Sequence, residues 1–239
     1  MPEDTINFLK RLAEQNPERG IFSAVINDKN GVTVRLKSGL VINDILPESY
    51  DIVNIKNSRP RIQMLKIIID TSLLHNLYYQ AGFAHEIGHV IYPNEQQESD
   101  EIYSLEFEVL TQKFFTKPLD YRLSIISKQL KLKMNNEIKA WEAGKPIADL
   151  IGVDRNKYEE LMILGLQGHY SAQVDYISHL IKDNCPDITQ NTQISIFNSL
   201  TNTDDQMRFS EFTEYNRKMV EMNNRAVNQF DQRIGILRT

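Results

Sequence analysis

The sequence predicts an α+β fold, in which a small antiparallel or mixed sheet precedes a mostly helical C-terminal half. Short apolar runs separated by turn signals predict strands between about residues 21 and 70. Beyond residue 71 almost no strand pattern occurs, and helical periodicity dominates. The 239 residues, of which 41% are hydrophobic and 25% charged, are sufficient for an independent globular core.

The first elements follow from local patterns. Residues 2–16 are predicted to form a short amphipathic helix, which an Asn-Pro pair terminates. Residues 21–26 have the composition of a strand, and the segment 27–31, with Asn, Asp and Gly, predicts a turn. Residues 32–36 alternate between apolar and polar side chains, which indicates a half-buried strand. Residues 40–42 are expected to complete a small antiparallel meander.

Two further segments extend the predicted sheet. Residues 50–55 are a strand candidate, and a cluster of β-branched residues favours a strand at 66–70. We therefore place the sheet at about residues 21–70, within a core domain of residues 1–150. Residues 151–239 are expected to form a helical region that packs on this core.

Caps and prolines divide the rest of the chain into helices. Thr71 can cap a helix at about 72–92, which the pair Pro93-Asn94 ends. A second helix is expected at about 97–116. Further helical segments are predicted at residues 119–132, 135–150, 154–166, 170–181 and 204–234. The last one carries an apolar stripe over only about two heptads, which favours packing on its own chain over a coiled coil.

The segment His85-Glu86-Ile87-Gly88-His89 has the pattern H-E-x-x-H. On a helix the two histidines lie four residues apart and project from one face, so both can bind one zinc ion. Glu86 is then placed to act as the general base towards a water at that ion. Gly88 costs a helix up to about 1 kcal/mol relative to alanine, which indicates that another backbone or a substrate approaches closely there.

A catalytic zinc site requires a third protein ligand besides water. The helix after the motif offers Glu106. Its neighbours at one turn's distance are mostly apolar, namely Ile102, Tyr103, Val109 and Leu110. A carboxylate on a buried face is costly unless it is paired or binds a metal, so Glu106 is the preferred third ligand. Glu108 lies on a more polar face and is the last choice among the glutamates, because a solvated surface charge explains it better.

Glu137 is the alternative to Glu106 as third ligand. Apolar residues that include Trp141 flank it at one turn's distance, so Glu137 can also face inward. The small side chain of Ala140 would allow this helix to approach another one closely. For Trp141 itself, simple packing in the core is the favoured role. A downstream histidine, His169 or His179, is the remaining option for the third ligand.

The HExxH segment and the helix after it resemble the gluzincin metallopeptidases, and most closely the compact ImmA/IrrE-type metallopeptidases. The resemblance covers about residues 66–116, within which residues 106–110 are similar to the family's Glu-x-Glu-Ala-Asn stretch. It implies a zincin-like core with His85 and His89 as metal ligands, Glu86 as base, and a glutamate from the next helix. It also implies that the strand before the motif lies beside the active-site helix, where its edge can hold an extended peptide.

The expected function is that of a zinc metallopeptidase, in which activated water hydrolyses a peptide bond of a protein or peptide substrate with Glu86 as general base. The resemblance suggests a regulatory protein as the substrate. One alternative is a catalytically inactive zincin-like protein that binds or regulates a partner; another is a zinc hydrolase of small amides. Three side chains are available to donate a hydrogen bond to the oxyanion, although a structural role is favoured for each and none is preferred: Tyr103, His169 and Tyr170.

Composition limits the remaining function classes. The net charge of −5 gives no support for a nucleic-acid partner, and no apolar run approaches the ~20 residues of a membrane span. The acidic N-terminus lacks the pattern of a signal peptide, so a cytoplasmic location is expected. Cys185 is the single cysteine, which excludes a disulfide within one chain. The oligomeric state stays open.

Overall fold

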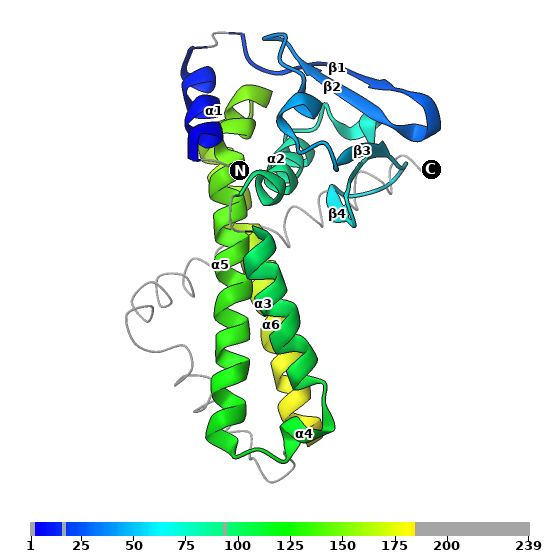
Figure 1. The fold of residues 1–239 in the computed structure, drawn as a ribbon. Helices are drawn as coiled ribbons and strands as arrows, with labels where there is room; N and C mark the ends of the chain where they lie inside the picture. The colour runs from blue at the N-terminus through cyan, green and yellow to red at the C-terminus, as the bar shows by residue number, and fades with distance from the viewer. Residues whose placement is uncertain (1–2, 16–17, 93–94, 185–239) are drawn as a thin grey trace, which may run out of the picture. The chain divides into compact units, whose positions relative to one another are not determined.

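The computed structural model describes residues 3–15, 18–92 and 95–184, and this part of the chain has the expected α+β class (Figure 1). Strands are confined to the N-terminal part, and helices follow them. Among the described helices, none is both long and apolar enough to cross a membrane. The helix expected at 204–234 and the single cysteine, Cys185, lie outside the described residues.

The chain forms two compact units, Met1–Leu166 and Gln167–Thr239. Helix α6 (Arg155–Asn184) begins in the first unit and continues into the second. We expected the boundary at residue 150, but Tyr158 of α6 is buried in the core of the first unit with 2% of its surface exposed. The first unit therefore includes the beginning of α6.

The N-terminal hairpin is confirmed. Strands β1 (Ile21–Ile26) and β2 (Val32–Leu36) pair antiparallel, and the three apolar side chains of β2 are buried on one face as their alternation predicts. The connection is a short 3-10 helix, η1 (Asp28–Asn30), in which Lys29 and Asn30 have positive φ values of 58° and 66°. Asparagine tolerates this backbone region better than most residues, so the turn signal in the sequence has a clear structural basis.

The prediction of a third strand of the meander at residues 40–42 is wrong. Val41 makes one isolated bridge to Arg35, after which the chain enters the 3-10 helix η2 (Ile42–Ile45). The side chain of Asn43 explains the difference, because its Oδ1 accepts a hydrogen bond from the main chain of β2 at 3.0 Å and its Nδ2 donates to that chain at 2.9 Å. A side chain thus bonds to the edge of β2 where a third strand would pair.

A second, three-stranded sheet consists of β3 (Asp51–Asn54), β4 (Arg61–Gln63) and β5 (Lys66–Ile69) in the order β3-β5-β4. Strand β3 runs parallel to β5, whereas β4 runs antiparallel to it. The strands expected at 50–55 and 66–70 are therefore present. We also expected the strand at 66–70 to offer an open edge to a peptide. This expectation is wrong, because β5 is the central strand of the sheet and pairs on both sides.

Helix α2 (Leu77–Ile91) carries the HExxH segment. It starts later than expected, because the preceding residues form a separate 3-10 helix, η3 (Thr71–Leu73). Asn76, rather than Thr71, is the N-cap, and its side-chain oxygen accepts hydrogen bonds from the first main-chain N–H groups of the helix. Asparagine is among the best N-cap residues for this reason.

The other helices are α1 (Glu3–Gln15), α3 (Glu95–Val109), α4 (Gln112–Phe115) and α5 (Leu119–Ile151). The second expected helix is divided, because α3 ends at Val109 and α4 follows as a short turn. Conversely, α5 and α6 are each one continuous helix where the sequence predicted two shorter ones. Gly144 and Pro146 lie within α5 without ending it.

Helix α2 lies between the strands and α5, and it packs on both (Figure 1). Its side chains Phe83, Ile87 and Ile91 have no exposed surface. They belong to one apolar core with the buried residues of the sheets and of α5. The helix with the motif is therefore the centre of the first unit rather than an element on its surface.

Candidate metal centre

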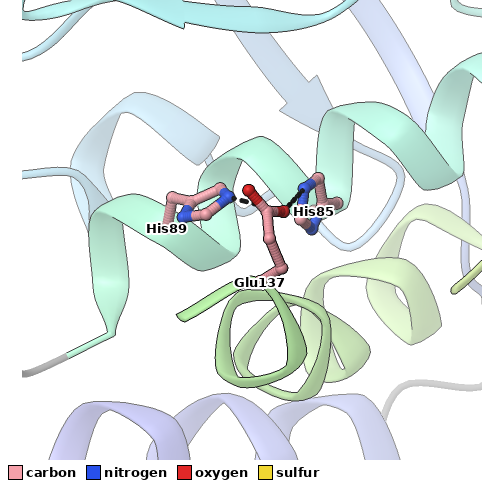
Figure 2. Close-up of side chains that lie close together, drawn as sticks. All are labelled: His85, His89 and Glu137. Atoms are coloured by element: carbon pink, nitrogen blue, oxygen red, sulfur yellow. Dashed lines mark ion pairs between the residues drawn. The ribbon is translucent and has the colours of Figure 1, made fainter. Parts of the chain in front are cut away.

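His85 and His89 lie on the side of α2 that faces α5 (Figure 2). Their spacing of four residues places them on adjacent turns of the helix, as the sequence predicts. His85 is 6% exposed, and the side chain of His89 is 12% exposed. Both imidazoles are thus held within the packed part of the unit and largely removed from bulk water.

Two glycines allow the backbones of α2 and α5 to meet. A Cβ atom at Gly88 would lie 1.9 Å from the carbonyl oxygen of Ala140, and one at Gly144 would lie 2.6 Å from the carbonyl oxygen of Ala84. No side chain fits at such distances, so the close approach predicted from Gly88 and Ala140 is confirmed. The contact places Glu137, which lies one turn before Ala140 on α5, opposite the two histidines.

The carboxylate of Glu137 lies between the two imidazoles (Figure 2). Its Oε2 atom is 3.3 Å from Nε2 of His85 and 3.4 Å from Nε2 of His89. The two imidazole rings are 4.7 Å apart between centroids and inclined by 69°. Among the described residues, these three side chains form a group whose potential ligand atoms all lie within 4.8 Å of one another, close enough to bind one metal ion.

The structure brings Glu137, the alternative, to the histidines, and not the preferred Glu106. The carboxylate of Glu106 is 2.5 Å from Nζ of Lys133, at the contact between α3 and α5. Glu108 accepts a hydrogen bond of 2.6 Å from the hydroxyl of Tyr121. Of the apolar residues beside Glu106, Ile102 and Val109 are buried, whereas Tyr103 and Leu110 are exposed. The Glu106 side chain is 31% exposed and its charge is balanced by a lysine, which removes the reason to expect a metal there.

Glu86 follows His85 directly in α2, so its side chain leaves the helix about 100° around the axis from that of His85. It is partly exposed, in contrast to the buried His85. Of the three candidate oxyanion donors, Tyr103 on α3 is 67% exposed. The other two candidate donors, His169 and Tyr170, belong to the part of α6 that lies in the second unit. The remaining ligand candidate, His179, belongs to the same part of α6.

Trp141 is buried, as its expected role in core packing requires, with 5% of its surface exposed. Its indole also stacks on the imidazole of His85, with centroids 4.3 Å apart and ring planes inclined by 21°. The sequence analysis missed this contact, although a signal was present. Glu137 and Trp141 are four residues apart on α5, so a carboxylate that faces α2 implies a tryptophan that faces it too.

Comparison with known proteins found no relative whose site could be compared with this one. No family model matches the chain, and neither a curated protein nor a solved structure matches it.

Proposed function

We propose that the protein is a zinc-dependent metallopeptidase, with His85, His89 and Glu137 as metal ligands and Glu86 as general base. The observation that carries the proposal is the convergence of the two motif histidines and Glu137 on one point. Two neutral imidazoles and one carboxylate are a common ligand set of catalytic zinc, which keeps its fourth position for water.

The spacing of the ligand atoms supports this assignment. Zinc binds nitrogen and oxygen ligands at about 2.0–2.2 Å, so the ligand atoms of a tetrahedral site lie about 3.3–3.6 Å apart. The distances from Glu137 to the two histidine nitrogens, 3.3 and 3.4 Å, agree with that geometry. Two of the three ligand-atom distances thus already match those of a tetrahedral zinc site, and all three atoms lie within 4.8 Å of one another.

A bound zinc ion would supply Lewis acidity, which lowers the pKa of a water ligand towards about 7. The role that we assign to Glu86 is to accept a proton from the water as its oxygen attacks the carbonyl carbon of a peptide bond. The same carboxyl group then donates this proton to the amine nitrogen as the C–N bond breaks. Its partial exposure suits such a role, because the base must reach water and substrate.

The resemblance to gluzincins, and to the ImmA/IrrE-type enzymes among them, supports a peptidase through the matched residues His85, Glu86 and His89. The proposed third ligand departs from the expected pattern. It comes from α5 and not from α3, the helix that follows the motif. We propose a protein or peptide as the substrate class, and a regulatory protein as the substrate that the resemblance suggests.

A proteome-derived peptide library, analysed by mass spectrometry, tests the reaction. Wild-type protein with one equivalent of zinc should cleave a subset of the peptides, and Glu86→Gln should lose at least about 100-fold in rate because it lacks the base. The variant should still bind zinc, since Glu86 is not a ligand in this proposal. Full activity of Glu86→Gln would contradict the mechanism, and stoichiometric zinc without any cleavage by wild type would favour the inactive regulatory protein.

A further inference from the structure

We propose that Trp141 is a positioning residue of the metal centre, which holds the imidazole of His85 in the orientation that binds the ion. The inference rests on the proposed metal site and goes beyond it. It assigns a second function to a side chain that also serves in core packing, and it connects the metal centre to the beginning of α6.

The need for such a residue follows from the side chain of histidine. The torsion that turns an imidazole about its Cβ–Cγ bond has a broad energy profile, so the backbone alone does not fix where Nε2 points. The indole of Trp141 lies nearly parallel to the imidazole of His85, at a centroid distance of 4.3 Å. Since both side chains are buried, a rotation of the imidazole would drive its edge into the indole.

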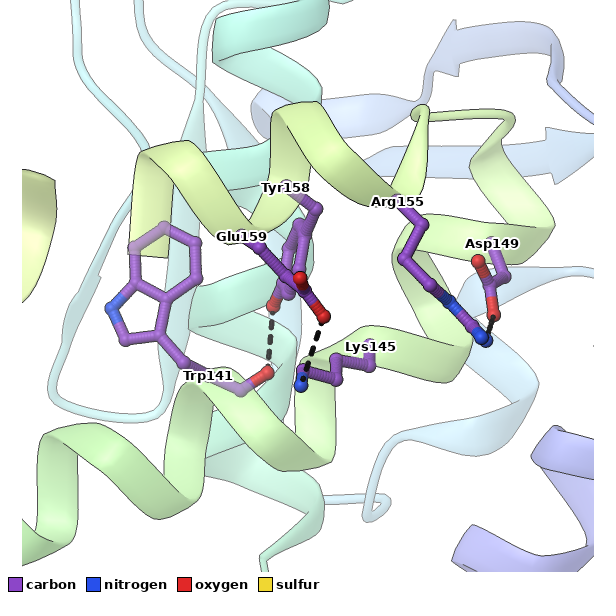
Figure 3. A network of polar contacts seen from close by, with 6 residues as sticks. All are labelled: Trp141, Lys145, Asp149, Arg155, Tyr158 and Glu159. Carbon is purple, nitrogen blue, oxygen red and sulfur yellow. Dashed lines mark hydrogen bonds and ion pairs between the residues drawn. The ribbon is translucent and has the colours of Figure 1, made fainter. Parts of the chain in front are cut away.

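The indole is itself held in place by α6. The hydroxyl of Tyr158 donates a hydrogen bond of 2.9 Å to the carbonyl oxygen of Trp141, and the two aromatic rings meet edge to face at 5.2 Å (Figure 3). Burial raises the pKa of the Tyr158 phenol, so this group keeps its proton and remains a donor. On the same helix, Gly165 leaves space for the ring, since a Cβ atom there would lie 2.8 Å from Cζ2 of Trp141.

Ion pairs fasten the beginning of α6 to the end of α5 (Figure 3). The guanidinium Nη2 of Arg155 is 3.1 Å from Oδ2 of Asp149, and Nζ of Lys145 is 3.5 Å from Oε1 of Glu159. Contacts therefore run from the start of α6 through the indole to the imidazole of His85. The charge of the ion adds to this arrangement, because a metal-bound imidazole becomes more positive and the face of an indole is the best aromatic partner for positive charge.

Zinc affinity and a cobalt spectrum of the full chain test the proposal. The matched variants are Trp141→Phe, which keeps an aromatic face against His85, and Trp141→Leu, which keeps an apolar side chain without one. We expect Trp141→Leu to bind zinc roughly 10- to 100-fold more weakly, the loss typical of groups that orient metal ligands. Trp141→Phe should recover most of the affinity.

The absorption spectrum of the protein saturated with Co²⁺ separates a positioning role from a general loss of stability. It should change in Trp141→Leu, because the geometry of the ligand set changes, and return towards wild type in Trp141→Phe. Either a wild-type zinc affinity or an unchanged cobalt spectrum in Trp141→Leu overturns the proposal. Wild type that binds neither metal is a different result, since it refutes the metal site and with it the proposed function.

A second pair of variants decides the question if Trp141→Leu does not fold. Gly165→Ala places a methyl group against the indole, whereas a Cβ atom at Gly168 of the same helix meets nothing within 4 Å. Both changes should favour the helix by up to about 1 kcal/mol. Only Gly165→Ala should weaken zinc binding and alter the cobalt spectrum, and equal behaviour of the two variants in both measurements overturns the proposal.

Discussion

Helix α5 packs against α2 and against α3 in different ways, and the contrast explains which glutamate meets the histidines. Against α2, the contact is made by glycine and alanine, with the two backbones touching. Against α3, it includes ion pairs between long side chains, such as Lys128 with Glu101 and Lys133 with Glu106. Glu137 lies at the first contact and Glu106 at the second.

Two carboxylates of the same residue type thus have different chemistry. Glu106 is paired with the ammonium group of Lys133, which balances its charge. Glu137 faces two imidazoles, which balance its charge fully only if they bind a proton or a metal ion. The partner of a partly buried acid, and not its degree of burial alone, therefore distinguishes a candidate metal ligand from a paired surface charge.

The largest expected effect comes from breaking the contact between α2 and α5. Gly88→Ala places a methyl group 1.9 Å from the carbonyl oxygen of Ala140, so the helices must separate. We expect the free energy of unfolding, measured by urea denaturation, to fall by about 3 kcal/mol, at the upper end for overpacked cores. The control is Gly82→Ala on the same helix, where the nearest atom is Cγ of Pro60 at 3.4 Å, and its effect should stay within about 1 kcal/mol. Equal effects of the two changes would refute the account of the crossing.

A third acid, Asp70, differs from both glutamates because its hydrogen bonds come mainly from neutral donors. The hydroxyl of Ser72 and then the main-chain N–H of Asn57 hold the pKa of Asp70 below its ordinary value of 3.8. A folded-state pKa below that of the unfolded chain stabilises the fold above about pH 4, and this stabilisation is lost as the pH falls through the folded-state pKa.

The difference in unfolding free energy between wild type and Asp70→Asn should therefore be largest near neutral pH and should shrink below about pH 4. Chemical denaturation across a pH series measures it. Asp51 at the start of β3 is exposed, so Asp51→Asn serves as the control for the same chemical change at the surface. A gap that stays constant down to the lowest pH would contradict the role given to Asp70.

The smallest effect belongs to the contact between α3 and α5. A double-mutant cycle with Glu106→Ala and Lys133→Ala should give a coupling of about 1 kcal/mol or less, because the pair is partly exposed. High salt should reduce this coupling. A coupling of several kcal/mol that salt does not change would contradict this, because it would show that the pair behaves as a buried one.

Local patterns predicted much of the fold. Features that depend only on neighbouring residues could be predicted from the sequence. They are the alternation in β2, the amphipathic helix α1 and the asparagine-rich turn between β1 and β2. The strand expected at 40–42 failed because the side chain of Asn43 bonds to β2 in its place. A side chain that hydrogen-bonds to a strand edge in place of another strand leaves no periodic pattern in the sequence.

The candidate site could be predicted in part for the same reason. His85 and His89 are one turn apart on one helix, whereas the choice between Glu106 and Glu137 depends on which helix crosses α2. Small residues at the crossing contained that information: Gly88 on α2, and Ala140 and Gly144 on α5. Apolar neighbours suggested a buried face for Glu106, but Tyr103 and Leu110 among them are exposed, and the pattern could not show that Lys133 reaches the carboxylate.

The zinc content of the purified protein decides whether Glu137 or Glu106 completes the metal site. Wild type, Glu137→Ala and Glu106→Ala should each be purified without chelators, supplied with zinc, dialysed and analysed by mass spectrometry for metal per chain. We predict about one zinc ion per chain in wild type and in Glu106→Ala, and a loss of most of the metal in Glu137→Ala, which lacks one of three protein ligands. Loss of zinc in Glu106→Ala with retention in Glu137→Ala would contradict the assignment, and a wild type that binds no zinc would refute the metal centre itself.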